Sequence, residues 1–111
     1  MLDNYLRILQ ANLNRSQTAT ESTLQIAIEL SIDIIVVQEP WLIGHTRTPP
    51  DYTNARSTSH PSFIQILPTL PILSTRPRVL LYISRSFQAQ INPIQDFSLP
   101  DPDFLIVTVQ N

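Results

Sequence analysis

The sequence has 111 residues, enough for one domain with a hydrophobic core and too few for two. Its 42% hydrophobic and 14% charged residues exclude a disordered chain, and its net charge of −2 excludes attraction of nucleic acid by overall charge. The absence of cysteine excludes disulfides and thiolate metal sites. No apolar run has the length of a membrane span and no signal peptide pattern opens the chain, so we expect an intracellular protein without membrane contact.

The first expected elements are a short buried strand at Leu6–Ala11 and a helix that runs from about Thr18 to Ser31. Thr18 is followed three residues later by Glu21, the spacing of a capping box at a helix start. Apolar residues then recur at helical spacing: Leu24, Ala27 and Ile28, with Ile26 and Leu30 beside them.

A second strand is expected at Ile34–Gln38, where four successive β-branched residues indicate a strand covered on both faces. Strand, helix and strand over this length form a βαβ unit, whose two strands run parallel. The sequence therefore predicts an α/β fold that opens with a βαβ unit.

The remainder of the chain predicts strands without intervening helices. Residues 44–59 are polar and contain two adjacent prolines, so we expect a long surface loop there. Strands are expected after it, and we predict that they add antiparallel to the same sheet. Their ranges are Phe63–Leu67, Val79–Ile83, Gln88–Ile91 and Phe104–Val109. Because the last strand ends two residues before the end of the sequence, we expect a truncated fragment with an open strand edge and poor solubility.

Two polar residues follow the strands of the βαβ unit. Asn12 comes directly after the first strand and Glu39 after the second, and both strands deliver their carboxyl ends to one edge of the sheet. Pro40 is expected to keep Glu39 in an extended conformation. A carboxylate beside an amide suits a hard cation such as Mg²⁺. Two plainer interpretations stay open: a solvated carboxylate at Glu39, and an Asn12 side chain that caps its own backbone.

Residues 6–16 (LRILQANLNRS) and 33–41 (DIIVVQEPW) resemble the opening of the endonuclease/exonuclease/phosphatase superfamily, and most closely the N-terminal endonuclease domain of non-LTR retrotransposons. Arg76–Ile83 and Asp103–Val107 are similar to later strands of such domains. The resemblance implies a DNase I-like fold, a four-layer α/β sandwich, of which residues 1–111 would be the N-terminal part.

The resemblance also implies a function. Glu39 matches the glutamate that binds Mg²⁺ or Mn²⁺, and Asn12 matches an asparagine that lines the metal and phosphate site. Arg15 lies near this site and is a candidate for a phosphate or DNA contact, with a plainly solvated side chain as the open alternative. In a complete retroelement protein such a domain nicks DNA for target-primed reverse transcription. The implied setting is nuclear, with a reverse transcriptase domain in the same polyprotein.

The resemblance is incomplete, because no residue of the sequence matches the later aspartate–asparagine and aspartate–histidine pairs of the family. We therefore expect the fragment to be inactive alone. Two alternatives remain: a phosphatase or lipid phosphodiesterase of the same superfamily, and a non-catalytic α/β remnant.

Other polar and aromatic residues favour structural roles. We expect solvated or loop-stabilising histidines at His45 and His60, and turn formation at Asp101 and Asp103, which flank a proline. Packing is favoured over base stacking for Trp41.

Overall fold

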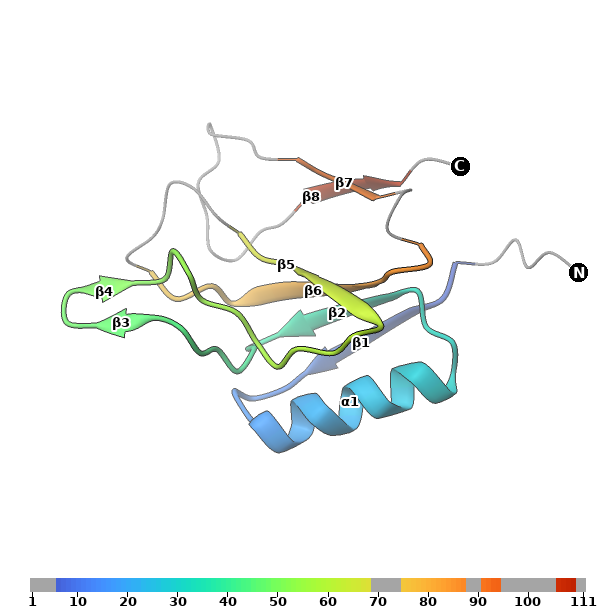
Figure 1. Cartoon of the computed structure of the whole chain (residues 1–111), viewed down its shortest axis with the longest axis horizontal. Helices are drawn as coiled ribbons and strands as arrows, with labels where there is room; N and C mark the ends of the chain where they lie inside the picture. Colours follow the sequence, from blue (N-terminus) through green and yellow to red (C-terminus); the bar gives the residue numbers. More distant parts are fainter. Residues whose placement is uncertain (1–5, 69–74, 88–90, 95–105, 110–111) are drawn as a thin grey trace, which may run out of the picture.

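The computed structural model describes residues 6–68, 75–87, 91–94 and 106–109. A mixed four-stranded sheet carries a single helix, α1 (Gln17–Glu29), on one of its faces (Figure 1). The strand order in this main sheet is β1-β2-β6-β5, with bounds Ile8–Asn12, Ile34–Gln38, Val79–Ser84 and Phe63–Ile66 respectively. The prediction of an α/β domain is confirmed. In the described part of the chain, no helix has the length and apolarity needed to cross a membrane.

The βαβ unit is present as predicted, although β1 is a half-exposed edge strand and not the buried strand expected. β1 and β2 are parallel neighbours, with Ile8 opposite Ile34 at one end and Asn12 opposite Gln38 at the other. α1 connects them and packs on the sheet, as a parallel crossover requires. The carboxyl ends of both strands therefore reach the same edge of the sheet.

The helix begins at a different cap from the one predicted. Ser16 is the N-cap, and its Oγ accepts a hydrogen bond from the Ala19 N–H at 3.1 Å. Thr18 lies inside the helix, so the capping box with Glu21 is wrong. The reason is local: Asn14 and Arg15 both take left-handed conformations, which turn the chain early enough for Ser16 to cap.

The core lies between α1 and the sheet. Leu24 and Ala27 from the helix pack against Ile35, Val37 and Leu80 from the strands, all nearly inaccessible to solvent. Alternate residues of the same strands form a second cluster on the opposite face, consisting of Ile34, Leu81 and Ile83. β2 is thus buried on both faces, which explains its unbroken β-branched run.

The strands after the loop follow the prediction only in part. β6 is antiparallel to β2, and β5 is antiparallel to β6, so both extend the main sheet as expected. β7 (Ile91–Ile94) and β8 (Ile106–Val109) instead pair with each other in a separate two-stranded sheet. β7 cannot join β6, because β2 and β5 already occupy both hydrogen-bonding edges of β6.

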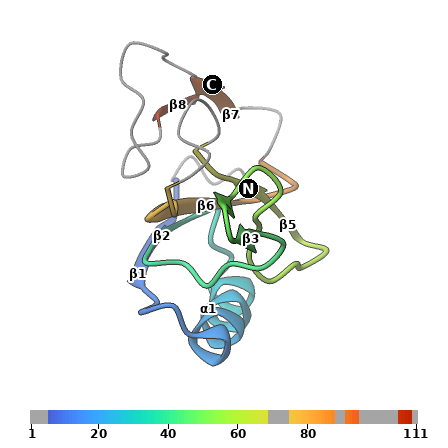
Figure 2. The same ribbon diagram turned by 90° about the vertical axis from the view of Figure 1, so that its left-hand side faces the viewer.

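This two-stranded sheet lies on the side of the main sheet opposite α1, as both ribbon views show (Figures 1 and 2). The expected strands at Gln88–Ile91 and Phe104–Val109 overlap β7 and β8 only in part. Residues 88–90 and 104–105 lie outside the described residues.

The region predicted as a surface loop contains a small hairpin, β3 (Thr46–Arg47) with β4 (Pro50–Asp51). The hairpin is closed by a bridge between Ile43 and Arg56. Gly44 sits at its base with φ +81°, and a Cβ there would lie 2.7 Å from the Asn54 carbonyl oxygen. Both the backbone conformation and the close approach therefore require glycine at this position.

The end of this loop is held to the sheet by side chains that we call the Gln65 cluster: Gln65, Ser57, Thr58 and Tyr82. The Gln65 amide accepts from the Ser57 N–H at 2.8 Å and donates to the Ser57 and Thr58 carbonyl oxygens at 3.0 and 3.1 Å. The Tyr82 hydroxyl donates to the Thr58 carbonyl oxygen at 2.7 Å. The Ser57 and Thr58 hydroxyls themselves have no partner among the described residues.

Candidate functional site

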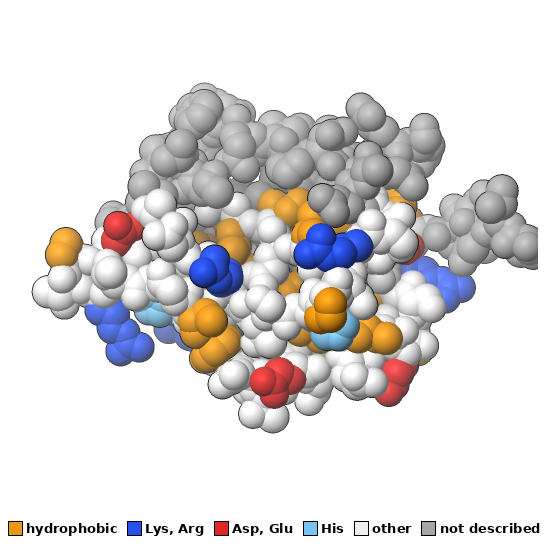
Figure 3. Space-filling model, viewed as in Figure 1, with side chains coloured by type: hydrophobic (Ala, Val, Ile, Leu, Met, Phe, Trp, Pro, Cys, Tyr) orange, Lys and Arg blue, Asp and Glu red, His pale blue; other side chains and the backbone are white. Residues whose placement is uncertain are grey.

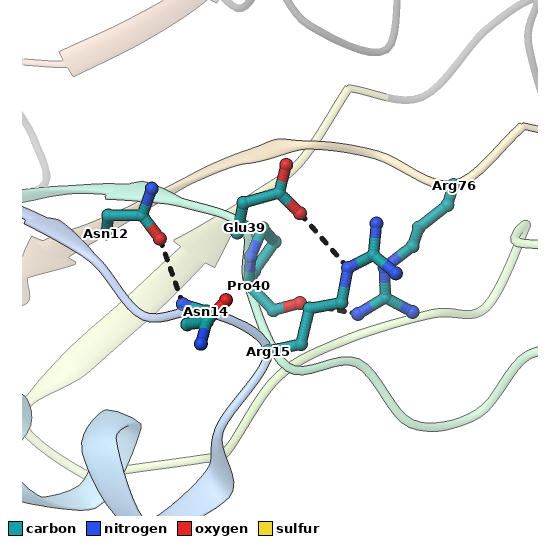
Figure 4. Close-up of polar contacts among 6 residues, drawn as sticks. All are labelled: Asn12, Asn14, Arg15, Glu39, Pro40 and Arg76. Atoms are coloured by element: carbon teal, nitrogen blue, oxygen red, sulfur yellow. Dashed lines mark hydrogen bonds and ion pairs between the residues drawn. The ribbon is translucent and has the colours of Figure 1, made fainter.

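Asn12 and Glu39 lie together at the edge of the main sheet where β1 and β2 end (Figure 4). Asn12 is the last residue of β1 and faces Gln38 across the ladder, and Glu39 follows Gln38 directly. The Leu13 N–H continues the ladder by donating to the Gln38 carbonyl oxygen at 2.9 Å. The predicted juxtaposition is confirmed. We call this edge, with residues 12–15, Glu39, Pro40 and Arg76, the carboxyl rim.

The backbone of Glu39 is not extended, contrary to the prediction. Its φ is +51°, in the left-handed region. Two hydrogen bonds fix this conformation: the Glu39 N–H donates to the Arg78 carbonyl oxygen at 3.0 Å, and its own carbonyl oxygen accepts from the Arg15 N–H at 2.8 Å. These contacts with two separate segments outweigh the local preference that Pro40 imposes.

Left-handed backbone is concentrated at the carboxyl rim. Asn14, Arg15 and Glu39 have φ values of 49°, 59° and 51°. Among the described residues, one other non-glycine residue has a positive φ, Ser31, which lies just after α1. Such a conformation costs about 1–2 kcal/mol for a residue with a Cβ. Residues held in this way cluster at sites where a protein needs fixed geometry.

Arg15 forms an ion pair with Glu39. Its Nε lies 3.0 Å from Glu39 Oε2, and the two side chains are 57% and 33% exposed. Solvent therefore screens the pair, and such pairs contribute about 0 to 1 kcal/mol. The second carboxylate oxygen, Oε1, has no hydrogen-bond partner in the part of the chain that the structure describes. Within the described ranges, Glu39 thus keeps one unpaired ligand atom while Arg15 occupies the other.

Asn12 stabilises its own loop. Its Oδ1 accepts a hydrogen bond from the Asn14 N–H at 3.0 Å, an Asx turn that helps hold Asn14 in the left-handed region. The Asn12 side chain is exposed at the rim, beside Glu39 (Figure 4). Asn12 therefore caps its own backbone in this structure, as the plainer interpretation of this residue predicted. A carbonyl-type oxygen has two lone pairs, so this bond leaves one of them open.

Arg76 is a residue of the carboxyl rim that sequence reasoning missed. Its Nη2 donates to the Pro40 carbonyl oxygen at 2.6 Å, and its Nε is buried without a partner among the described residues. The sequence carries no signal for its position, which depends on the antiparallel pairing of β6 with β2 that places the start of β6 beside the end of β2. Residues just before β6 therefore reach the same edge as Glu39.

The remaining candidates lie away from the rim or stabilise loops. His45 stacks on Tyr52 with ring centroids 4.9 Å apart. The Nδ1 of His60 accepts from the Ser62 N–H at 3.0 Å. Trp41 is half-buried, and Asp101 and Asp103 lie outside the described residues.

A single carboxylate with a neighbouring amide can hold a hard cation that keeps most of its water ligands, as Mg²⁺ commonly does. Over the described ranges, no three histidine, aspartate or glutamate side chains come together as a complete metal-ligand group. The carboxyl rim therefore fits a partly hydrated Mg²⁺ that would be bound through Glu39 Oε1, with Asn12 beside it. It does not fit a cation that requires a full protein cage.

Charged side chains on the face seen in Figure 3 are scattered, with positive and negative groups interspersed over its described part. The described part of this face therefore offers a phosphate-bearing ligand no broad basic surface, and binding there would depend on individual arginines.

No protein-family model matches the sequence, and neither a curated protein nor a solved structure matches it significantly.

Proposed function

We propose that this chain is the N-terminal part of a Mg²⁺-dependent phosphodiesterase domain with a DNase I-like, four-layer α/β architecture, and that its substrate in the complete protein is DNA. The domain would be of the endonuclease type found in non-LTR retrotransposons. Glu39 is the proposed metal ligand, Asn12 lines the phosphate position, and Arg15 is a proposed phosphate contact.

The observation that carries the proposal is the position of Glu39. Its carboxylate stands beside Asn12 at the shared end of two parallel strands, where open α/β sheets bind ligands. Its backbone is held in a left-handed conformation by hydrogen bonds to two other segments. A solvated surface carboxylate does not require this fixation, whereas a metal ligand benefits from it.

The residues of the rim would act by binding and orientation. A bound Mg²⁺ would supply Lewis-acid stabilisation of charge on a phosphoryl oxygen. Glu39 would hold the cation through Oε1, and the Asn12 amide N–H₂ can donate to a phosphate oxygen. Arg15 offers a planar fork of donors to the same group. Activation of the attacking water would require a further residue, and none in this sequence matches the one used by the family.

One observation favours the rival interpretation, a non-catalytic α/β remnant. The Arg15–Glu39 ion pair neutralises the carboxylate, and an exposed pair of this kind can be an ordinary surface contact. The two interpretations differ in whether Mg²⁺ can displace Arg15 from Glu39 or occupy the free oxygen beside it.

Mg²⁺ titration with Trp41 fluorescence separates the two interpretations, because Trp41 is the single tryptophan and lies two residues beyond Glu39. We expect a saturable response in the native chain, its loss in Glu39→Gln, and its retention in Glu29→Gln. Glu29 is an exposed carboxylate at the end of α1 and serves as the matched control. A flat titration of the native chain, or equal responses in all three proteins, would overturn the metal assignment.

The substrate is tested in a chain that also carries the later catalytic pairs. We expect nicking of supercoiled plasmid in Mg²⁺ and its loss in Glu39→Ala. Turnover of a phosphomonoester or an inositol phosphate without nicking would instead assign the phosphatase or lipid phosphodiesterase activity.

A further inference from the structure

Arg76 carries a charge that the described structure does not balance. Its guanidinium makes one hydrogen bond, to the Pro40 carbonyl oxygen at 2.6 Å, and the side chain is half-buried. Its Nε is buried and unpartnered, and no carboxylate among the described residues pairs with it. A buried donor on a charged group is costly to leave without an acceptor, so this position favours an anion.

Arg15 brings a second guanidinium to the same place. Arg15 is bonded to Glu39 through both its backbone and its side chain, and Arg76 is bonded to Pro40, the next residue. The two side chains come from different segments and bond neighbouring residues of the rim, Glu39 and Pro40 (Figure 4). Glu39 can neutralise one of these charges, and no other carboxylate of the described residues balances the second.

We propose that Arg15 and Arg76 form a phosphate-binding guanidinium pair, and that Glu39 is the internal anion that occupies Arg15 until a phosphate replaces it. The inference rests on the proposed phosphodiester chemistry of the rim and adds Arg76 and the exchange of partners to it. Arginine suits this role because its fork of N–H donors matches phosphate oxygens.

The exchange makes the anion and the metal mutually supportive. If Glu39 held a cation, its carboxylate would be less available to Arg15, and the Arg15 guanidinium would be free to bind phosphate. By reciprocity, a phosphate that engages Arg15 frees Glu39 for the cation. The pair thus acts without direct metal contact, and its anion affinity can be measured in the absence of metal.

The first test is binding of inorganic phosphate to the 111-residue chain in EDTA, followed by NMR or calorimetry. We expect Arg15→Gln and Arg76→Gln each to weaken binding about tenfold or more, the effect of one charge-assisted hydrogen bond. Arg47→Gln removes the same charge from the exposed β3 strand and should leave the affinity unchanged. The proposed phosphate-binding pair would be overturned by equal losses of phosphate affinity in all three variants, or by no loss in the two rim variants.

The second test uses Glu39→Gln in the same metal-free assay. Loss of the competing carboxylate should strengthen phosphate binding several-fold, and Arg15→Gln should cancel this gain. Unchanged or weaker binding would overturn the exchange, even if Glu39→Gln also abolishes Mg²⁺ binding and so supports the proposed function. Conversely, Glu39→Gln could bind phosphate more tightly while the native chain binds no Mg²⁺. That result would support the guanidinium pair and reject the metal site.

Folding and ligand source are controlled separately. Arg15→Lys and Arg76→Lys keep the charge, so partial retention of phosphate binding is expected, and circular dichroism of each variant checks the fold. A short DNA duplex titrated in parallel distinguishes a nucleic-acid phosphodiester from free phosphate. Displacement of bound phosphate by the duplex assigns the pair to DNA, and a duplex that leaves phosphate bound assigns it to a small phosphorylated ligand.

Discussion

The carboxyl rim and the Gln65 cluster are two places where polar side chains gather on the main sheet, and they use their hydrogen-bonding groups differently. In the Gln65 cluster, one amide and one phenol bond the backbone of residues 57 and 58 at 2.7 to 3.1 Å. At the rim, charged groups stand on left-handed backbone, and Glu39 Oε1 and Arg76 Nε have no partner among the described residues.

The difference separates groups that hold the fold from groups available to a ligand. The Gln65 cluster is neutral and largely buried, and it turns its side chains to backbone atoms that would otherwise lack partners. The Ser57 and Thr58 hydroxyls of the cluster lack partners among the described residues, but they are neutral, whereas the rim leaves atoms of charged groups unpaired on backbone in a conformation that costs free energy. Substitutions in the cluster should therefore alter stability, and substitutions at the rim should alter binding.

The largest effect on stability is expected from Gln65→Leu, which keeps the volume of the side chain and removes three hydrogen bonds. At about 1 kcal/mol for each bond, the free energy of unfolding in urea should fall by about 3 kcal/mol. Gln25→Leu is the control, because the exposed Gln25 amide bonds only Glu29 on the same helix among the described residues. If Gln65→Leu lowered the free energy of unfolding no more than Gln25→Leu does, the Gln65 cluster would not be what holds the loop to the sheet.

A smaller effect is expected from Tyr82→Phe, which removes the hydrogen bond to the Thr58 carbonyl oxygen. The free energy of unfolding should fall by about 1–2 kcal/mol. Burial raises the pKa of the Tyr82 hydroxyl above its usual value of 10.0, so the folded chain holds this proton more tightly than the unfolded chain does.

The contribution of Tyr82 is therefore fully present below pH 10.0 and is lost as pH rises through the raised pKa. Urea unfolding measured across this alkaline range should show declining stability in the native chain and a flatter profile in Tyr82→Phe. If the stability of both proteins changed with pH in the same way, the decline could not be assigned to the Tyr82 hydroxyl.

The smallest effect on stability is expected from Glu39→Gln, the substitution that should abolish Mg²⁺ binding. The Arg15–Glu39 pair is partly exposed, so its removal should change the free energy of unfolding by no more than about 0.5 kcal/mol. A loss of 2 kcal/mol or more, on the order of a core substitution, would show that Glu39 holds the fold and would remove the contrast between the two regions.

Much of the fold was predictable because local pattern and connectivity agree. The β-branched run of β2 and the apolar spacing of α1 predicted the βαβ unit, which in turn predicted that Asn12 and Glu39 meet. The helix cap was predicted wrongly, because Ser16 became available only through the left-handed turn at Asn14 and Arg15. Asparagine tolerates the left-handed region, so Asn14 was a weak sign of this turn, but nothing in the sequence marks Arg15, a residue type without that preference.

The sequence by itself determined the parallel pair β1–β2, the helix between them and the edge at which Glu39 stands, since these follow from periodicity and from the geometry of a parallel crossover. Only the tertiary structure decided how Glu39 is held and what surrounds it. Its left-handed backbone depends on hydrogen bonds to Arg15 and Arg78, residues distant in the chain. Arg76 reaches the rim because β6 pairs antiparallel with β2, and strand pairing over such a separation is set by the packing of the whole sheet.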